Sequence, residues 1–587
     1  METALGVERS LTGRRWVWRP SSAREAAALS QRLGLPELVG RLLAARGVGL
    51  EAAADFLAPT LRAFLPDPSV LRDMDQAAAR LADAAARSER VAVFADYDVD
   101  GACSGALMVL ALRALGCEVS HYVPDRLAEG YGPNAPAIAR LVAGGATLIV
   151  CVDCGISAHE ALGAAAGRAD VVVLDHHKAE GPPPEVVAAV NPNRLDCPSR
   201  LGLLCAAGVA FLAAVATQRE LRRRGFFAAR PEPDLRRLLD LVALATVCDV
   251  VPLLGVNRAF VTQGLRVLAA RERPGLVALM EVAGARGGPD PHTLGFQLGP
   301  RINAGGRISV PDLGLRLLIE ADPLEARGLA ERLDTVNRER QAIEGGVLAA
   351  AMAQAEAQSA EGRAVLLVAG EGWHPGVVGI VAGRVRERFN RPACVAAVGD
   401  GVAKGSGRSV PGLDLGAAVL AARQAGLLLA GGGHAMAAGF TAEAGRLDAL
   451  HAHLEERLAA ARALPGKAEL LLDGALEVAA ATPALAERIA SLGPFGAGHD
   501  EPLVAVRAAR VVKASRVGRE GTTVRAFLEG EGGGRLKAIS FRAAEGPLGE
   551  ALLRAGAGPL HLCGVLRAES WNDRLSAQLL VQDAAPA

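Results

Sequence analysis

Short apolar runs alternate with helical stretches between residues 91 and 174. The runs begin at residues 91, 119, 147 and 171, so consecutive starts are 28, 28 and 24 residues apart. The runs are Val91–Ala95, Val119–Val123, Thr147–Val152 and Val171–Leu174, and the helical stretches between them are Gly105–Leu115, Ala135–Val142 and Ala158–Ala166. This alternation predicts βαβ units with a parallel sheet covered on both faces. Ligands of such sheets bind beyond the carboxyl ends of the strands.

Helical patterns flank this region, and a second α/β pattern follows them. Residues 21–85 and the stretch from Gly208 to about Met280 have helical patterns, and Pro323–Ala360 predicts one long connecting helix. The second α/β pattern consists of predicted strands at Ala364–Val368 and Ala393–Val398 and predicted helices at Val377–Arg388, Leu415–Ala425 and Ala442–Ala461.

After Pro465, short β-like runs alternate with Gly-rich turns. The runs are Ala468–Leu472, Leu503–Val506, Thr522–Leu528, Leu536–Phe541, Leu560–Leu566 and Leu575–Val581. Short strands of this kind predict a small β-barrel, with an OB-like fold as one candidate. The chain is therefore expected to be an α/β multidomain protein. The predicted parts are an N-terminal helical region (1–70), a parallel-sheet domain (71–320), a connector helix (321–362), a second α/β domain (363–465) and an OB-like β-barrel (466–587).

Composition narrows the classes of partner and compartment. Lys+Arg and Asp+Glu are both 64 among 587 residues, which excludes a protein that holds polyanions by bulk charge but leaves local basic grooves open. The nine cysteines are scattered and odd in number, which is typical of a reducing cytoplasm. Met1–Pro20 lacks the apolar segment of a secretory signal, and no apolar run reaches the roughly 18 residues that a membrane span needs. We expect a soluble cytoplasmic protein without a membrane partner.

Three carboxylates follow the first predicted strand. Asp96, Asp98 and Asp100 alternate in an extended segment, so their side chains point to one side and repel one another unless a cation neutralises them. A calcium EF-hand loop begins in the same way, but its twelfth position needs a Glu, and that position is Leu107 here. The EF-hand interpretation therefore fails.

Other strand ends carry similar chemistry. The third run ends in Cys151-Val-Asp153-Cys154, where no second cysteine pair supports a zinc ribbon, so Asp153 is the residue of interest. The fourth run is followed by Asp175-His176-His177, and mixed imidazole and carboxylate ligands suit borderline divalent ions.

A further carboxylate, Asp249, lies in an apolar stretch, where an unpaired charge is costly. A single Asp at a strand end is more often a helix cap than a ligand. Three of four strand ends on one sheet edge carry Asp or His, however, and together they favour a dinuclear Mn²⁺ or Mg²⁺ site.

The ordered motifs resemble the DHH phosphoesterase superfamily. Those of the first half are Asp96-Tyr-Asp-Val-Asp-Gly101, Val152-Asp-Cys-Gly155, Asp175-His-His177 and Thr246-Val-Cys-Asp-Val-Val-Pro252. Those of the second half lie at Gly299–Arg307, Gly372–Ile380, Gly405–Ser409 and Gly431–Gly439, and they are similar to the single-stranded-DNA exonucleases of the superfamily, which have a second, DHHA1-type domain. The match spans about residues 70–450, and the C-terminal β region lies where those exonucleases carry an OB-fold.

The resemblance implies hydrolysis with two divalent metal ions, Mn²⁺ or Mg²⁺. The implied ligands are Asp98, Asp100, Asp153, His176 and Asp249, with Asp96 and His177 as ligands or as supports of the ligands. Several relatives carry a metal-binding His where this chain has Phe94, and Asp96 is the candidate replacement. Metals would lower the pKa of an attacking water and polarise a phosphoryl oxygen. Asp153, which would orient that water, His176 and His434 are the implied catalytic residues.

The second half of the chain supplies the expected substrate contacts. Ser406 and Arg408 would hold a terminal phosphate, and Gly432 and Gly433 would allow the close backbone approach that places His434 near the scissile phosphate. Taken alone, the segment around Ser406 is also typical of a tight turn, and the segment before His434 is typical of a turn that starts a helix.

Two other motifs add candidates for substrate binding. Arg301, Asn303 and Arg307 are expected to contact the DNA backbone, and their alternative is an ordinary polar loop. Trp373 and His374 could stack on a base, although a lone Trp is also often a core residue.

The activity implied by the resemblance is that of a 5′→3′ exonuclease releasing 5′-mononucleotides from single-stranded DNA in repair and recombination. A single-stranded-DNA-binding protein and a helicase are candidate partners. One alternative is a phosphodiesterase for oligoribonucleotides or cyclic dinucleotides, which would have no use for the last 120 or so residues. The other alternative, a non-catalytic DNA-binding scaffold, predicts missing metal ligands, and none is missing.

Overall fold

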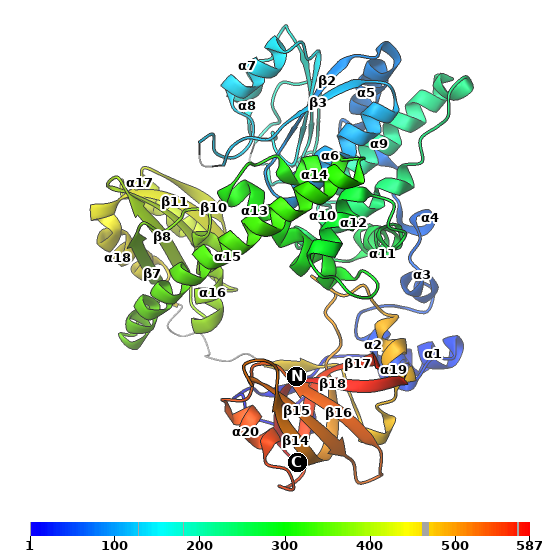
Figure 1. Cartoon of the computed structure of the whole chain (residues 1–587), viewed down its shortest axis with the longest axis vertical. Helices are drawn as coiled ribbons and strands as arrows, with labels where there is room; N and C mark the ends of the chain where they lie inside the picture. The colour runs from blue at the N-terminus through cyan, green and yellow to red at the C-terminus, as the bar shows by residue number, and fades with distance from the viewer. Residues whose placement is uncertain (1, 127, 180, 461–468, 572–573) are drawn as a thin grey trace. The chain divides into compact units, whose positions relative to one another are not determined.

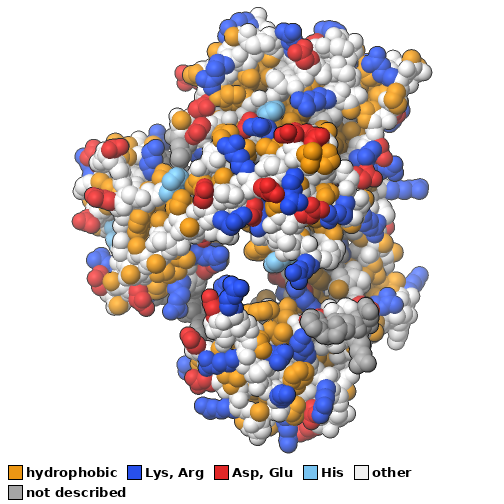
Figure 2. Space-filling view, viewed as in Figure 1, with side chains coloured by type: hydrophobic (Ala, Val, Ile, Leu, Met, Phe, Trp, Pro, Cys, Tyr) orange, Lys and Arg blue, Asp and Glu red, His pale blue; other side chains and the backbone are white. Residues whose placement is uncertain are grey.

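The chain folds into two compact units, each built from segments distant in sequence. The computed structural model describes residues 2–126, 128–179, 181–460, 469–571 and 574–587. One unit, the α/β unit, contains Asp67–Asp249 and Gly264–Gly466, and the other, the barrel unit, contains Met1–Pro66, Val250–Gln263 and Lys467–Ala587 (Figure 1). Lys and Arg side chains are interspersed with Asp and Glu over the visible surface in Figure 2, in keeping with the zero net charge.

A five-stranded parallel sheet forms the first half of the α/β unit. Its order is β3-β2-β4-β5-β6, with bounds Glu118–Tyr122, Arg90–Ala95, Leu148–Val152, Asp170–Leu174 and Ala188–Val190. The predicted parallel sheet is confirmed, with β6 as a strand that the sequence pattern did not indicate. The central strands are buried along almost their whole length, which explains their continuous apolar sequences.

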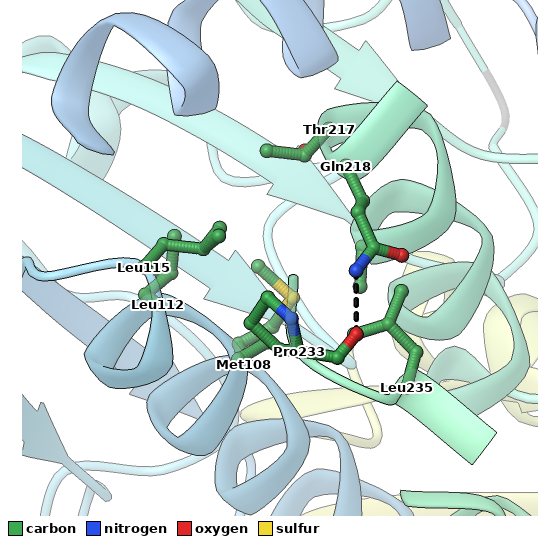
Figure 3. A pocket seen from close by; sticks show the side chains of 9 residues that line it. Met108, Leu112, Leu115, Thr217, Gln218, Pro233 and Leu235 are labelled. Carbon is green, nitrogen blue, oxygen red and sulfur yellow. Dashed lines mark hydrogen bonds between the residues drawn. The ribbon is translucent and has the colours of Figure 1, made fainter. Parts of the chain in front are cut away.

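Helices cover both faces of this sheet. One face carries α7 (Ala135–Ala143) and α8 (His159–Gly163), and the other carries α5 (Met74–Arg87), α6 (Val99–Ala114) and α9 (Ala206–Arg223) (Figure 1). A cavity of about 10 Å³ between α6 and α9 is lined mainly by apolar side chains and bordered by the hydrogen bond from Gln218 Nε2 to the Pro233 carbonyl, 2.6 Å (Figure 3). It has room for one water at most, so the active site lies elsewhere.

A helical region completes the first half of the α/β unit. Its elements are α10 (Leu239–Cys248), α12 (Pro274–Val282), the π-helical turn η5 (Thr293–Leu298), α13 (Gly299–Ile308), α14 (Leu313–Ile319) and α15 (Pro323–Ala360). Helix α11 (Gly255–Ala269) begins in the barrel unit, to which its residues up to Gln263 belong. The long connecting helix is confirmed as α15. The polar-loop alternative for residues 301–307 is wrong, because they lie in α13, whose Ile302 packs against Gly314 of α14.

A second, mixed sheet has the order β10-β11-β9-β8-β7. The strand bounds are Ala430–His434, Ala437–Glu443, Val402–Arg408, Ala393–Gly399 and Leu366–Glu371, and the covering helices are α16 (Val378–Phe389), α17 (Leu415–Gln424) and α18 (Leu447–Arg457). Only β7 and β8 are parallel.

The glycine-rich motifs of this half form strands. Gly405–Arg408 lies in β9 and Gly431–His434 in β10, so the tight-turn and helix-start alternatives are wrong. The Phe440 ring covers Gly405 so closely that a Cβ there would lie 2.1 Å from a ring atom. The helix expected from Ala442 begins at Leu447, because β11 continues to Glu443. The expected helix end at Ala461 and strand start at Ala468 lie outside the described residues.

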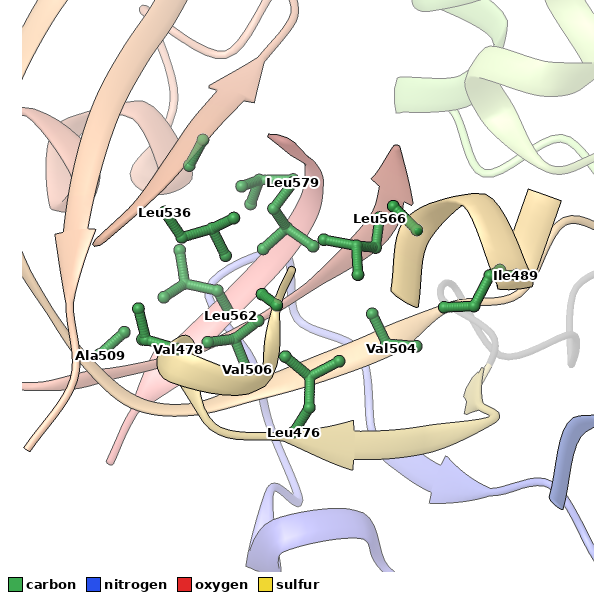
Figure 4. Packing of buried hydrophobic residues seen from close by; sticks show 14 of the residues in the cluster. Leu476, Val478, Ile489, Val504, Val506, Ala509, Leu536, Leu562, Leu566 and Leu579 are labelled. Carbon is green, nitrogen blue, oxygen red and sulfur yellow. The ribbon is translucent and has the colours of Figure 1, made fainter. Parts of the chain in front are cut away.

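The C-terminal strands form a closed five-stranded barrel, which confirms the OB-like prediction. Strands β14 (Val504–Val517), β15 (Thr523–Glu529), β16 (Arg535–Ser540), β18 (Arg574–Pro586) and β17 (Leu560–Trp571) pair in that order, and β17 pairs with β14 to close the ring. Val506, Leu536, Leu562 and Leu579 meet in its core (Figure 4). The shorter elements β13 (Gly474–Leu476), α19 (Pro483–Ala490) and α20 (Pro547–Leu553) flank the barrel.

The N-terminal segment belongs to the barrel unit. Strand β1 (Trp16–Trp18) pairs in parallel with β12 (Leu470–Leu472), and α1 (Ala23–Leu33) and α2 (Glu37–Ala44) share the barrel's apolar core, ahead of the short helices α3 (Ala53–Leu57) and α4 (Leu61–Phe64). The buried Asp473 carboxylate pairs with Arg19 at 3.0 Å and Arg46 at 3.2 Å. Among the described residues, no helix combines the length and apolarity needed to cross a membrane.

Candidate active site

Acidic side chains gather at the carboxyl edge of the first sheet. Asp96 follows β2, Asp153 follows β4 and Asp175 follows β5. Strand β2 lies between β3 and β4, so the chain leaves β2 to one side for β3 and returns on the other side for β4. Such a switch point opens a crevice at the carboxyl ends of the strands, where α/β proteins bind their ligands.

Asp98 and Asp100 are placed by two helix N-termini. Asp98 is the N-cap of α6 and accepts a hydrogen bond from the Gly101 amide at 3.0 Å. The Asp100 carboxylate is buried and accepts hydrogen bonds from the Ala206 and Ala207 amides at 2.6 and 2.8 Å, in the first turn of α9. The positive end of a helix favours a carboxylate at this position.

The two histidines approach these carboxylates from the end of β5. His176 Nδ1 lies 3.1 Å from the Leu204 carbonyl, a contact that places the proton on Nδ1. Nε2 faces Asp153 Oδ1 at 3.3 Å and Asp100 Oδ2 at 3.7 Å. Asp249, at the end of α10, completes this side, with its Oδ2 3.7 Å from His176 Nδ1.

The structure brings all seven predicted metal ligands together. Within each of three groups, potential ligand atoms lie within 4.8 Å of one another; the groups are Asp96–Asp98–Asp153, Asp153–His176–His177 and Asp100–His176–Asp249. Asp153 and His176 each belong to two groups. Neighbouring groups that share ligands are the arrangement that a dinuclear site requires.

The electrostatics of the cluster fit divalent cations. Burial, with Asp98 close by, raises the pKa of Asp96 well above its usual value, and burial and the neighbouring carboxylates do the same to Asp153. Burial, with Asp100 and Asp98, raises the pKa of Asp249 to about 8. Asp96 Oδ1 and Asp153 Oδ1 are buried and have no hydrogen-bond partner among the described residues. A cation would satisfy these oxygens and relieve the repulsion.

Asp175 supports the histidines rather than joining the ligand groups. Its buried carboxylate accepts hydrogen bonds from the amides of Ile156 (3.0 Å), His176 (2.7 Å) and His177 (3.1 Å), and from His177 Nδ1 (2.8 Å). Burial alone would raise the pKa of Asp175, but the bonds from His177 hold it below its usual value. Burial likewise opposes the charged form of His177, yet Asp175 raises the pKa of His177 to about 9.

Two asparagines fix the backbone of the same segment. Asn191 Nδ2 donates to the His177 carbonyl at 2.8 Å, and Asn193 Nδ2 donates to the His176 carbonyl at 2.6 Å. The sequence analysis missed both asparagines, although they follow β6 at the same sheet edge.

Tyr131 is a second residue that the sequence analysis missed. Its hydroxyl donates to the Asp153 carbonyl at 3.0 Å and lies 3.1 Å from His177 Nδ1. Asp153 has a φ of 59°, an unfavourable conformation for a non-glycine residue. The Tyr131 bond therefore holds the carbonyl of a strained residue in place. The only sequence signal was the pair of flanking glycines, Gly130 and Gly132, which have φ of 85° and 75°.

Beside the acidic cluster, three arginines lie close enough to repel one another. Burial and the nearby Arg126 and Arg340 lower the pKa of Arg307 to about 10, and Arg307 is also close enough to interact with Asp98. Burial and Arg126 also lower the pKa of Arg408. Arg408 Nη1 donates to Ser406 Oγ at 3.1 Å. Arg307 and Arg408 are half-buried and Arg126 is exposed. Cations that converge in this way indicate an anionic ligand, and the sequence analysis missed Arg126.

Several predicted substrate residues have structural partners. Arg301 Nε pairs with Asp334 at 2.9 Å and so joins α13 to α15. The Trp373 ring lies over Gly370 and packs on the apolar cluster that contains Val381, the core role considered for it. His374 Nδ1 accepts a hydrogen bond from the Gly376 amide at 3.0 Å.

The remaining predicted residues have more open positions. Asn303 lines a pocket between α13, α15 and α16. Gly433 lies so close to Ala438 that a Cβ would come within 2.5 Å of its Cα. Gly432 is exposed in β10, and His434 is exposed at the end of that strand.

Comparison with protein families divides the chain in the same order as the fold. Residues 90–246 match the DHH family, N-terminal domain, residues 361–460 match the DHHA1 domain, and residues 472–583 match the RecJ OB domain.

The relatives that align with most of this chain share the same name. The chain is 34% identical over 579 residues to the single-stranded-DNA-specific exonuclease RecJ of Bacillus subtilis, covering 97% of this chain and 71% of the relative. It is 42% identical over 484 residues to RecJ of Dickeya dadantii, covering 80% and 83%. Crystal structures of Thermus thermophilus RecJ in complex with Mn²⁺ and with Mg²⁺ match the fold at TM-scores of 0.79 and 0.73. Both are 28% identical to this chain and cover 97% of it, and the matches cover 79% and 78% of the RecJ chains.

Proposed function

The chain belongs to the RecJ family of single-stranded-DNA-specific exonucleases, and from that membership we propose that it shortens single-stranded DNA from the 5′ end to 5′-mononucleotides. The observation that carries the proposal is the convergence of seven candidate ligands beside Arg126, Arg307 and Arg408. Two of these ligands have a buried oxygen without a hydrogen-bond partner among the described residues. The enzyme is a metal-dependent hydrolase, and its cofactor is Mn²⁺ or Mg²⁺.

The residues that would hold two such ions are Asp96, Asp98, Asp100, Asp153, His176, His177 and Asp249. When bound, the ions supply Lewis acidity, which lowers the pKa of a water and neutralises charge on a phosphoryl oxygen. Asp153 belongs to two of the ligand groups, and Tyr131 fixes its backbone, so its carboxylate is well placed to orient the attacking water. Asp175 keeps the histidine segment in position.

The arginines supply the substrate side of the proposal. Arg126, Arg307 and Arg408 would neutralise phosphates next to the scissile bond, and the Ser406 hydroxyl, already held by Arg408, adds a donor for a terminal phosphate. A pocket for a 5′-phosphate would set the polarity of the enzyme. His434 stays a candidate for a contact with the first nucleotide.

The biological setting is also part of the proposal. We propose roles in repair and recombination, a cytoplasmic location, and a single-stranded-DNA-binding protein and a helicase as partners. The division of the chain into the five parts given above is proposed with them. The cysteines are free thiols, which supports a reducing compartment. Full-length relatives are named as DNA exonucleases, so neither the oligoribonuclease nor the scaffold alternative gains support.

A labelled-oligonucleotide assay tests the proposal. Purified protein is incubated with 3′-labelled single-stranded DNA carrying a 5′-phosphate, with its duplex and with the matching RNA, each in Mn²⁺ or in EDTA. We expect a metal-dependent ladder that shortens from the 5′ end on single-stranded DNA only. Cleavage of RNA alone, or shortening from the 3′ end, would contradict the proposal.

A further inference from the structure

A pocket of about 480 Å³ lies between α13, α15 and α16 of the α/β unit. Its volume is within the range of small-molecule sites. Asn303 and Arg307 line it from α13, Arg340 and Gln341 from α15, and Arg384 from α16. The carboxylate at this pocket, Glu344, is already paired with Arg340. The lining therefore presents an excess of positive charge and several hydrogen-bond donors.

An exposed aromatic ring borders the same pocket. Phe296 is 73% exposed, in a chain of which only 3% of the residues are aromatic. One side of the ring stacks on His292, with centroids 5.0 Å apart and planes at 22°. Phe296 belongs to the π-helical turn η5, an irregular element that often marks functional sites. An exposed aromatic next to cationic and amide groups is the pattern on which single-stranded bases stack.

Helix α13 connects this pocket to the metal ligands. Gly306 of α13 packs on the loop that carries Asp96 and Asp98, so closely that a Cβ on Gly306 would lie 2.6 Å from the Tyr97 carbonyl oxygen. Arg307 lines the pocket and is also close enough to Asp98 to interact with it. A DNA strand whose scissile phosphate lies at the metal ligands can therefore follow α13 into the pocket.

We propose that this pocket is a nucleotide-binding subsite for single-stranded DNA beyond the first nucleotide on the 3′ side of the scissile bond, with a base stacked on Phe296 and its phosphate held by Arg340 and Arg384. The inference rests on the proposed exonuclease function. The subsite binds substrate and takes no part in the bond-breaking step, so its contribution depends on substrate length.

Steady-state kinetics of Phe296→Ala test the subsite. The substrates are a 5′-phosphorylated 20-nucleotide DNA and the dinucleotide 5′-phosphoryl-thymidylyl-thymidine, both in Mn²⁺. We expect the variant to raise KM for the 20-mer by roughly 5- to 150-fold, the range that loss of one stacked base gives, and to turn over the dinucleotide like the wild type. Phe296→Trp keeps an aromatic ring and should therefore have the wild-type KM for the 20-mer. Leu324→Ala, which truncates an 82% exposed apolar side chain at the start of α15, serves as the matched control and leaves both substrates unaffected.

An abasic scan locates the stacked base. A single abasic site is moved along the 20-mer one nucleotide at a time, and at one position it should raise the wild-type KM but leave the KM of Phe296→Ala unchanged. Equal 20-mer KM for the wild type and Phe296→Ala, or loss of dinucleotide turnover in the variant, overturns the subsite. A wild-type protein that leaves all the DNA substrates intact overturns the exonuclease proposal itself, and the subsite with it.

Discussion

Replacement of Asp175 by Asn tests whether the carboxylate behind the histidines prepares the metal site. Asp175 accepts hydrogen bonds from three amides and from His177 Nδ1, all between 2.7 and 3.1 Å. An Asn keeps one acceptor oxygen, which can retain the donors at Oδ1, and it turns its NH₂ toward the Ile156 amide. The variant therefore loses at least one charge-assisted hydrogen bond and leaves a buried donor unpaired.

The magnitude follows from these contacts. Loss of a charged hydrogen bond costs about 1.5–3 kcal/mol, and an unsatisfied buried donor adds about 1–3 kcal/mol, so the free energy of unfolding should fall by roughly 2.5–6 kcal/mol. Loss of a carboxylate that orients ligating histidines typically weakens metal affinity by about 10- to 100-fold. Isothermal titration of Mn²⁺ into the purified metal-free protein measures the second effect directly.

Asp170→Asn is the matched control, because Asp170 begins the same strand, β5, that Asp175 follows. Asp170 pairs with Arg80 at 2.6 Å on a half-exposed side chain, and such a surface pair contributes at most about 1 kcal/mol. We expect Asp170→Asn to bind Mn²⁺ like the wild type. Unchanged Mn²⁺ affinity in Asp175→Asn, or an equal loss in both variants, would refute the reasoning.

Four further outcomes are expected. Asp153→Ala should abolish hydrolysis and leave DNA binding largely intact, as measured by cleavage and by fluorescence anisotropy; retained turnover would remove Asp153 from the metal site. Arg408→Ala should slow cleavage of 5′-phosphorylated DNA more than cleavage of 5′-hydroxyl DNA. An equal loss of rate on both substrates would make Arg408 a general backbone contact. Arg258→Met should lower the free energy of unfolding of the barrel unit by about 3 kcal/mol in urea denaturation, because Arg258 donates to the Leu492 and Gly493 carbonyls at 2.8 and 2.6 Å. An unchanged urea midpoint would contradict this. Saturating Mn²⁺ at 100 times its Kd should stabilise the α/β unit by about 2.7 kcal/mol in thermal unfolding, and no shift would argue against binding at the cluster.

The metal cluster could be predicted from sequence because its residues follow strands with a clear apolar pattern. The carboxyl ends of β2, β4 and β5 had to meet at one sheet edge, so Asp96, Asp153 and His176 were expected to be neighbours. The supporting groups could not be predicted in this way. Tyr131 and Arg126 lie in the loop before α7, and only the folded chain brings them to the same edge.

Glycine-rich elements were harder to interpret. Strands β9 and β10 lack an alternation of apolar and polar residues. Side chains of other elements cover their glycines instead, such as Phe440 over Gly405 and Leu415 over Gly407. Helix α13 has little apolar periodicity and is defined by close packing instead, as at Gly306 against Tyr97. The pairing of β1 with β12 joins residues about 450 positions apart, a distance over which local patterns carry no signal.

The central claim is that Asp96, Asp98, Asp100, Asp153, His176, His177 and Asp249 hold the catalytic metals. The most direct measurement is a crystal structure of the protein soaked in Mn²⁺, with anomalous scattering recorded at the manganese edge. The account predicts two anomalous peaks within ligand distance of these side chains, with Asp153 and His176 among the contacts. No peak at this cluster, or peaks held by other residues, would contradict it.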